Sequence, residues 1–301
     1  MWSSNSAWQC IPWLVILITE CLVIVILNII TIVVFMKKKR QLQRRSTYLI
    51  IHLAIVDLLV GAVSGPLHIE VSMSWLCPLW EYRRETIWSH RSSFAFVHVF
   101  SFTSLLNLVF ISLERLHATF FPFRHRFIKK CVYKVMITVI WLTTIAREAA
   151  QIFLKEILIA PSDEINVYLY LLFYVVSVSV ICVSCILIVI KVRCTRHPQY
   201  HSRSKRERKL TGTSLFVSLV SLVCFLPAIT YIAYLLLSSS LRNFHISMAV
   251  LVLFLGNSLV NPIIYALRMP GFREGLLQIV CRVSDVSNTP VNLPLRNLRR
   301  T

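Results

Sequence analysis

A single carboxylate in the middle of an apolar stretch is the clearest chemical feature of the sequence. Asp57 lies in LAIVDLL (residues 53–59). An unpaired charge at such a depth in a bilayer costs about 3 kcal/mol. Polar residues that could reach it stand in other apolar stretches: Asn28, Ser104, Asn257, Ser258 and Asn261. Either a protonated Asp57 bonds these neighbours as a contact between helices, or Asp57 and neighbouring oxygens hold a hydrated cation.

A second polar group closes the last apolar stretch. Asn257 and Asn261 are four residues apart and therefore share one face of a helix. Pro262 has no N–H group, so it frees a backbone carbonyl and kinks the helix. The Asn261 side chain can bond the groups that are freed.

Seven apolar segments position these residues, and each is long enough to cross about 30 Å of hydrocarbon as a helix. They are residues 11–36, 46–71, 91–115, 132–154, 166–191, 212–237 and 244–267. Hydrophobic residues make up 56% of the chain, charged residues make up 15%, and the mean hydropathy is +0.70. These values exclude an ordinary soluble domain. We predict an all-α integral membrane protein with one seven-helix domain over residues 1–301, in which residues 268–301 form a tail.

The basic residues predict the orientation. The net charge is +19, and the Lys and Arg residues gather in alternate connections: residues 37–45, 124–134, 191–209 and the tail. By the positive-inside rule these connections are cytoplasmic, so the N-terminus lies outside and the C-terminus lies inside. The membrane surface rather than nucleic acid is the expected partner of this charge.

The order of these motifs resembles the rhodopsin-like (class A) G-protein-coupled receptors over nearly the whole chain. The resemblance rests on Asn28, Asp57, Glu114-Arg115-Leu116, Pro122, Trp141, Cys224-Phe225-Leu226-Pro227, the N-P-x-x-Y motif of residues 261–265, and Phe272-Arg273. His90 stands where most members carry a disulfide cysteine, and Ser177 stands in place of the fifth-span proline. Both departures give a loose likeness to the adenosine, melanocortin and cannabinoid branch.

The resemblance implies a two-state switch at the cytoplasmic side. In it, Arg115 pairs with Glu207 until the sixth helix swings about Pro227 and admits a heterotrimeric G protein, with Phe123 packing into that partner. The alternative for Glu207 is that it offsets neighbouring basic side chains in water. The switch and G-protein residues implied are Glu114, Arg115, Phe123, Glu207, Phe225, Pro227, Asn261, Pro262 and Tyr265. A short amphipathic helix is expected after the seventh span.

The same resemblance implies an allosteric sodium ion, and no other cofactor is expected. Its residues would be Asn28, Asp57, Ser104, Asn257, Ser258 and Asn261.

The ligand is expected in the outer half of the bundle. Val97 replaces the aspartate of amine receptors and Leu255 replaces the lysine that binds retinal, so neither a monoamine nor retinal is expected. The pocket residues that we predict are His68, Glu70, Val97, His98, Ser101, Ile229, Tyr231, Leu251 and Phe254. Such an apolar site with few polar groups suits a lipid, a small peptide or a nucleoside. His98 could instead be a histidine used only in helix packing.

The positions of three cysteines predict chemical modifications. Cys10 and Cys77 would both face the oxidising outside, where they would form a disulfide or remain as two free thiols. Cys281 follows the expected amphipathic helix and is a candidate for palmitoylation.

The sequence therefore predicts a plasma-membrane receptor that transduces a small extracellular ligand into G-protein activation. It shows no nucleophile–base set or phosphate-binding loop, so we expect no enzyme. Cys185, Phe225 and Leu116 depart from family positions used in signalling, and these departures favour the alternative of a non-signalling seven-helix scaffold or trafficking partner. A transporter is disfavoured because no internal repeat is evident.

Overall fold

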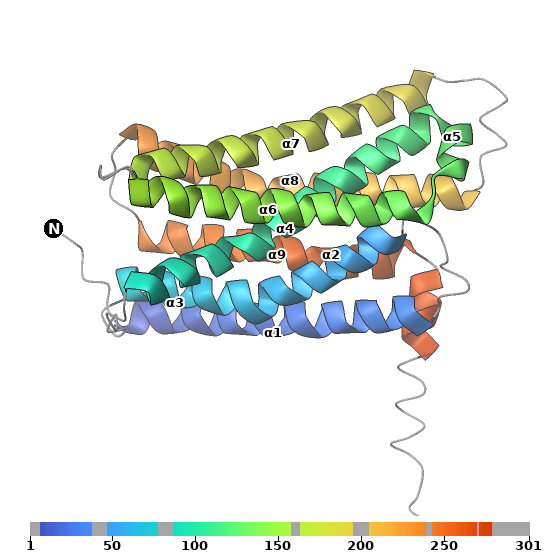
Figure 1. Cartoon of the computed structure of the whole chain (residues 1–301). Coiled ribbons are helices and arrows are strands. Elements are labelled where there is room, and N and C mark those ends of the chain that lie inside the picture. The colour runs from blue at the N-terminus through green and yellow to red at the C-terminus, as the bar shows by residue number, and fades with distance from the viewer. Residues whose placement is uncertain are drawn as a thin grey trace, which may run out of the picture.

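The computed structural model describes residues 7–37, 47–77, 87–157, 163–194, 205–238, 243–269 and 271–278. Side chains are not described for residues 7, 74–76, 87–96, 154–157, 163–166 and 205–210. The described residues form long helices packed side by side, with no strand among them (Figure 1). The predicted class, an all-α seven-helix membrane bundle, is confirmed.

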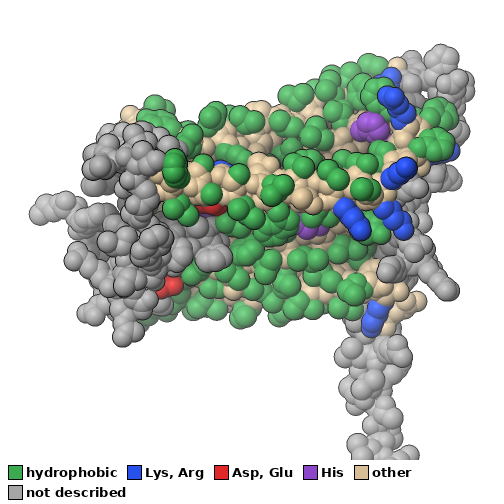
Figure 2. Space-filling model, in the orientation of Figure 1, with side chains coloured by type: hydrophobic (Ala, Val, Ile, Leu, Met, Phe, Trp, Pro, Cys, Tyr) green, Lys and Arg blue, Asp and Glu red, His purple; other side chains and the backbone are tan. Residues whose placement is uncertain are grey.

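Seven segments within the described ranges are long and apolar enough to cross a membrane. The first is α1 (Ala7–Lys37), and the second is built from α2 (Thr47–Leu59) and α3 (Gly65–Leu76). The others are α4 (Ile87–Phe120), α6 (Lys130–Ile157), α7 (Asp163–Cys194), α8 (Lys205–Ser238) and α9 (Phe244–Arg268). Large apolar side chains remain exposed along them, such as Leu142 at 62% and Leu219 at 58%. A soluble protein avoids such a continuous apolar surface, which a bilayer covers (Figure 2).

The third span continues further than predicted. The sequence placed its end at residue 115, but α4 continues to Phe120. The reason is local, because no helix breaker occurs before Pro122 and the Thr119 hydroxyl bonds the Arg115 carbonyl at 2.8 Å. Pro122 then occupies the first turn of α5 (Pro122–Phe127), where its missing N–H costs nothing.

A π-helical turn over Val60–Ser64 joins α2 to α3. Pro66 cannot donate a backbone hydrogen bond, and the preceding Gly65 N–H bonds the Val60 carbonyl five residues back. The two glycines of this segment also let α1 approach closely. A β-carbon on Gly61 would lie 2.8 Å from Cγ2 of Ile24, and one on Gly65 would collide with Sγ of Cys21.

The two ends of the bundle differ in their contents. At one end, called here the disulfide end, Cys10 of α1 is bonded to Cys77 after α3, with Cα atoms 6.2 Å apart. At the other, called here the Arg115 end, lie Arg115, α5 and the helical residues 271–278 (Figure 1). Basic side chains gather at this second end (Figure 2). The helix after α9 is anchored by Phe272, whose ring lies 5.5 Å from that of Phe35.

Candidate functional site

The Asp57 carboxylate is the centre of a closed hydrogen-bond network between α2, α4 and α9. Ser104 and Ser258 donate their hydroxyls to Oδ1 at 2.7 and 2.8 Å, and Asn261 donates its amide to Oδ2 at 2.7 Å. Asp57 has no exposed surface. Both carboxylate oxygens are therefore bonded to neighbouring spans, so the network ties three helices together.

Two other residues predicted for this site lie beside the network without bonding Asp57. Asn28 donates its amide to the carbonyls of Ile24 and Ser258, at 2.9 and 3.2 Å. The side-chain carbonyl of Asn257 is buried and has no hydrogen-bond partner among the described residues. Asn257 thus has a buried side-chain oxygen that can accept a further bond.

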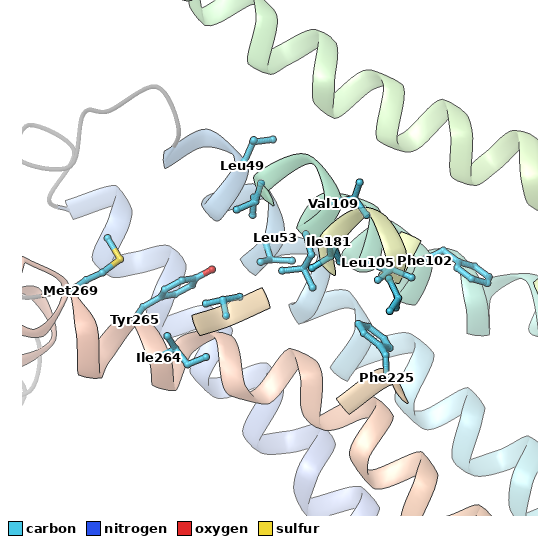
Figure 3. Close-up of a cluster of buried hydrophobic side chains, with 14 of the residues drawn as sticks. Leu49, Leu53, Phe102, Leu105, Val109, Ile181, Phe225, Ile264, Tyr265 and Met269 are labelled. Atoms are coloured by element: carbon cyan, nitrogen blue, oxygen red, sulfur yellow. The ribbon is translucent and has the colours of Figure 1, made fainter. Parts of the chain in front are cut away.

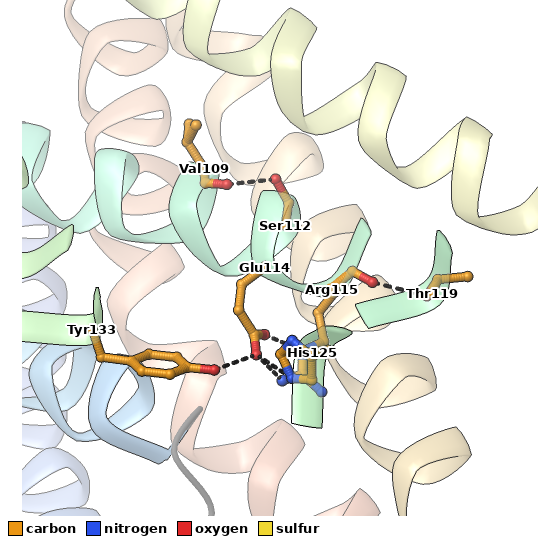
Figure 4. Close-up of polar contacts among 7 residues, drawn as sticks. All are labelled: Val109, Ser112, Glu114, Arg115, Thr119, His125 and Tyr133. Carbon is orange, nitrogen blue, oxygen red and sulfur yellow. Dashed lines mark hydrogen bonds and ion pairs between the residues drawn. The ribbon is translucent and has the colours of Figure 1, made fainter. Parts of the chain in front are cut away.

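At the Arg115 end, a buried carboxylate joins α4, α5 and α6 (Figure 4). Glu114 accepts hydrogen bonds from Nε and Nη2 of the adjacent Arg115, the latter at 2.6 Å. It also accepts from the Tyr133 hydroxyl at 3.1 Å, and Nε2 of His125 lies 3.2 Å away. Glu114 and Arg115 are 3% and 6% exposed. The arginine is therefore folded back onto its own helix rather than directed into solvent.

The remaining predicted switch residues have mixed outcomes. The Glu207 side chain lies outside the described residues, so its predicted pair with Arg115 stays a prediction, and Cys281 also lies outside them. Phe123 on α5 is 76% exposed, and its contact with a G protein stays a prediction. Phe225 is 2% exposed and lies on α8 two residues before Pro227.

The N-P-x-x-Y residues close the core between α9 and α1. Pro262 lies inside α9, and Tyr265 is buried with its ring 6.2 Å from that of Phe35. Tyr265, Ile264 and Met269 form one side of the hydrophobic cluster. Leu53 of α2 and Leu105 of α4 lie between them and Phe102 (Figure 3). The motif therefore connects the polar network at Asp57, through Asn261, with the hydrophobic core, through Tyr265.

Several residues predicted for the ligand pocket meet in one aromatic network. The rings of His68 and His98 lie 5.4 Å apart, and His68 lies 5.7 Å from Phe254. Phe254 in turn lies 5.7 Å from Phe225 of α8. The network, which spans α3, α4, α7, α8 and α9, consists of His68, His98, Phe102, Tyr170, Phe173, Tyr174, Phe225 and Phe254. It joins the predicted ligand residues to the proline of α8.

Two predicted pocket residues keep polar atoms without partners. Nε2 of His68 and the Ser101 hydroxyl are buried and unbonded within the part of the chain that the structure describes. Buried polar groups in proteins are almost always satisfied, so such atoms mark places where water or a ligand completes the bonding.

The other predicted pocket residues lie apart from the aromatic network or line its apolar edge. Tyr231 bonds the Ser247 hydroxyl at 2.9 Å, and the Glu70 side chain is exposed. Val97 and Leu251 are buried, and Ile229 packs against the core. Sequence reasoning could name the helices but could not fix how far each is rotated.

Sequence reasoning missed an ion pair in the fourth span. Nη1 of Arg147 bonds Glu148, and the two side chains are 11% and 8% exposed. The Arg147 guanidinium lies 3.5 Å from the ring centre of Phe102 and 4.0 Å from that of Tyr170. A charge inside a span was the available signal, the same one that marked Asp57.

Comparisons with known proteins agree with this geometry. The family model described as 7 transmembrane receptor (rhodopsin family) matches residues 27–265. The chain is similar to somatostatin receptor type 1 of Rattus norvegicus and of Mus musculus, each 25% identical over 200 residues. These alignments cover 60% of the chain and 51% of each relative, so the chain matches about half the length of these curated relatives.

Proposed function

Because the chain belongs to the rhodopsin family of seven-transmembrane receptors, we propose that it converts the binding of a small ligand at the disulfide end into activation of a heterotrimeric G protein at the Arg115 end. It is a G-protein-coupled receptor and a multi-pass membrane protein, and its family is not one of enzymes. The ligand class, the coupling and the orientation belong to the proposal. The likeness to somatostatin receptors is too partial to assign their ligand to this chain.

The proposed orientation in the plasma membrane puts the disulfide end outside. Its support is the gathering of basic side chains at the Arg115 end (Figure 2). Lys37, Arg193 and Arg268 lie in the last turns of α1, α7 and α9. The disulfide of Cys10 and Cys77 would then lie in an oxidising compartment, where such bonds persist.

The observation that carries the proposal is the buried Glu114–Arg115 pair. It has the form of a resting state, in which the arginine that would contact the G protein is bonded by Glu114, which Tyr133 and His125 also contact. Releasing Arg115 exposes a cation at the end where α5 presents Phe123. An equilibrium of this kind responds to a ligand that binds one state better than the other.

The aromatic network could transmit the effect of ligand binding from the disulfide end to α8. Ligand contacts at His68 or His98 would displace Phe254, which packs on Phe225. Phe225 lies two residues before Pro227, about which α8 can bend. A change at the disulfide end therefore reaches the helix that must move at the Arg115 end.

A sodium ion belongs to the proposal as an allosteric partner. The Asp57 carboxylate, the hydroxyls of Ser104 and Ser258 and the free Asn257 carbonyl are oxygen donors of the kind that a hard cation prefers. The ion would supply a positive charge beside Asp57. Asn261 donates its amide to Oδ2 of Asp57 and so orients the carboxylate, and Asn28 donates to the backbone carbonyl of Ser258.

The test is basal guanine-nucleotide exchange on a panel of G proteins in cell membranes. Glu114→Gln weakens the charged bonds that hold Arg115, which are worth about 1.5–3 kcal/mol each, so basal exchange should rise about tenfold or more. The double variant Glu114→Gln/Arg115→Ala should return to the baseline because the contact residue is gone. Ser179→Ala, at an exposed position of α7 outside the proposed sites, is the control.

Silence of every variant on every G protein, with surface expression verified, would sink the coupling proposal. It would favour a seven-helix scaffold or trafficking partner instead. Cys185 and Phe225, which depart from family positions used in signalling, support that alternative.

A further inference from the structure

One face of α6 presents three buried N–H donors that make no well-formed hydrogen bond within the described chain, although Arg147 also interacts with the Tyr170 hydroxyl. They are Nε and Nη2 of Arg147 and Nε2 of Gln151. The two residues are four apart, so their side chains lie on the same face of the helix. Gln151 is 8% exposed. Three unsatisfied donors side by side are far from the ordinary condition of a protein interior.

The nitrogens of Arg147 that remain without a well-formed hydrogen bond favour one kind of acceptor. Glu148 already occupies Nη1 of Arg147. The two nitrogens left over, Nε and Nη2, form the edge of the guanidinium that binds a carboxylate with two parallel hydrogen bonds. A planar two-oxygen acceptor therefore fits this edge better than a single hydroxyl or carbonyl does.

The plane of that edge is held in place by aromatic rings. The guanidinium carbon lies 3.5 Å from the ring centre of Phe102 and 4.0 Å from that of Tyr170, with Phe173 at 5.6 Å. Phe102 itself is fully buried, so the arginine points into the bundle rather than toward lipid. An arginine stacked in this way loses little further freedom when it binds, which favours affinity.

The position also suits a ligand that enters at the disulfide end. Arg147 lies six residues before Phe153, the last residue of its span, or about 9 Å along the helix. The His98 ring lies 4.5 Å from that of Tyr170, so the Arg147 group adjoins the aromatic network. The unbonded Ser101 hydroxyl lies on the same helix as His98.

We propose that Arg147 and Gln151 bind the carboxylate of an apolar, aromatic-compatible ligand whose body lies along the aromatic network. This inference rests on the proposed function only in placing the ligand at the disulfide end. Arg147 is the anchor, and Gln151 adds the third hydrogen bond. Glu148 keeps the guanidinium charged and oriented.

The test uses the thermal stability of the full chain in detergent micelles, without any G protein. The probes are 4-phenylbutyrate, 3-phenylpropionate and indole-3-acetate, each compared with its primary amide. A carboxylate that binds should raise the melting temperature of the wild type by about 5 °C at a hundred times its dissociation constant, because it binds only the folded state. Its amide should raise it far less, since one of the two acceptor oxygens and the charge are lost.

The decisive variant is Arg147→Gln/Glu148→Gln, which removes both charges together and so avoids leaving one buried and unpaired. It should fold and lose the carboxylate-induced shift. Gln151→Leu should reduce the shift, and Arg193→Gln, an exposed arginine on α7, should keep it in full.

Three results would overturn the proposal: no shift with any carboxylate, an equal shift with the amides, or a shift that survives in the double variant. Because the assay contains no G protein, a receptor that fails to couple can still bind these probes. Conversely, a coupling receptor that ignores them retains its function and loses only this ligand assignment.

Discussion

The Asp57 network and the Arg147 group are both buried charges inside the bundle, yet they differ in how far the chain satisfies them. Three donors from two other helices bond both oxygens of Asp57. Arg147 has one carboxylate partner and leaves two N–H groups unbonded within the described structure. A closed network can hold helices in register by itself. The Arg147 group can be fully hydrogen-bonded only when another molecule supplies an acceptor. We therefore infer that the Asp57 network stabilises the helix bundle and that the Arg147 group binds a ligand.

The largest loss of stability is expected when one partner of the Arg147–Glu148 pair is removed. Arg147→Leu leaves Glu148 buried without its cation, and losing one partner of a buried pair costs about 3–5 kcal/mol of unfolding free energy. The double variant Arg147→Leu/Glu148→Leu leaves neither charge and should recover most of that loss. Melting temperatures of the wild type, both single variants and the double variant form the cycle.

A double variant as unstable as the sum of the two single variants would contradict the pairing. It would mean that each residue acts through separate contacts, such as Arg147 on the rings of Phe102 and Tyr170.

The closed network should respond in a graded way. Asp57→Ala removes the acceptor of three buried donors, each of which then costs about 1 kcal/mol or more, so a loss of about 3 kcal/mol is expected. Asp57→Asn keeps one acceptor oxygen and should lose roughly a third of that. The measurement is the melting temperature in potassium salts, with Ser179→Ala at an exposed helix position as control.

Sodium tests whether the Asp57 network also binds a cation. If Asp57 and its neighbours hold the ion, then replacing potassium by sodium should raise the melting temperature of the wild type and leave both Asp57 variants unchanged. An equal sodium effect in Asp57→Asn would refute the site, because the amide carries no charge to attract the ion.

The two regions also show what sequence can predict. Asp57 and its partners were predictable because the bilayer makes a mid-span charge costly, and a helix repeat of 3.6 residues fixes which polar residues share a face. Arg147 and Glu148 carried the same signal but lie near the end of their span, where a long side chain ordinarily reaches out to water. Arg147 is buried by packing against Phe102 of α4 and Tyr170 of α7, and sequence alone gives no such contact.

Rotation about the helix axis limited the other predictions. The sequence could not show that the Tyr231 hydroxyl bonds Ser247, and its place in the pocket stays a prediction. The π turn at Val60–Ser64 changes the register of α3 relative to α2, which determines where His68 points. A residue inserted into a helix turn rotates everything after it, and no periodicity in the second span marked that turn in advance.

The smallest expected effect tests whether the Glu114 cluster behaves like the closed network. Tyr133→Phe removes one neutral-donor hydrogen bond to Glu114 and leaves the contacts from Arg115 and His125. Such a bond is worth about 1 kcal/mol, so basal nucleotide exchange should rise roughly fivefold if the bond exists only in the resting state. Tyr48→Phe, at an exposed tyrosine, should change nothing. Unchanged exchange in Tyr133→Phe, alongside a rise in Glu114→Gln, would mean that Tyr133 bonds Glu114 equally in both states and that Arg115 alone is released.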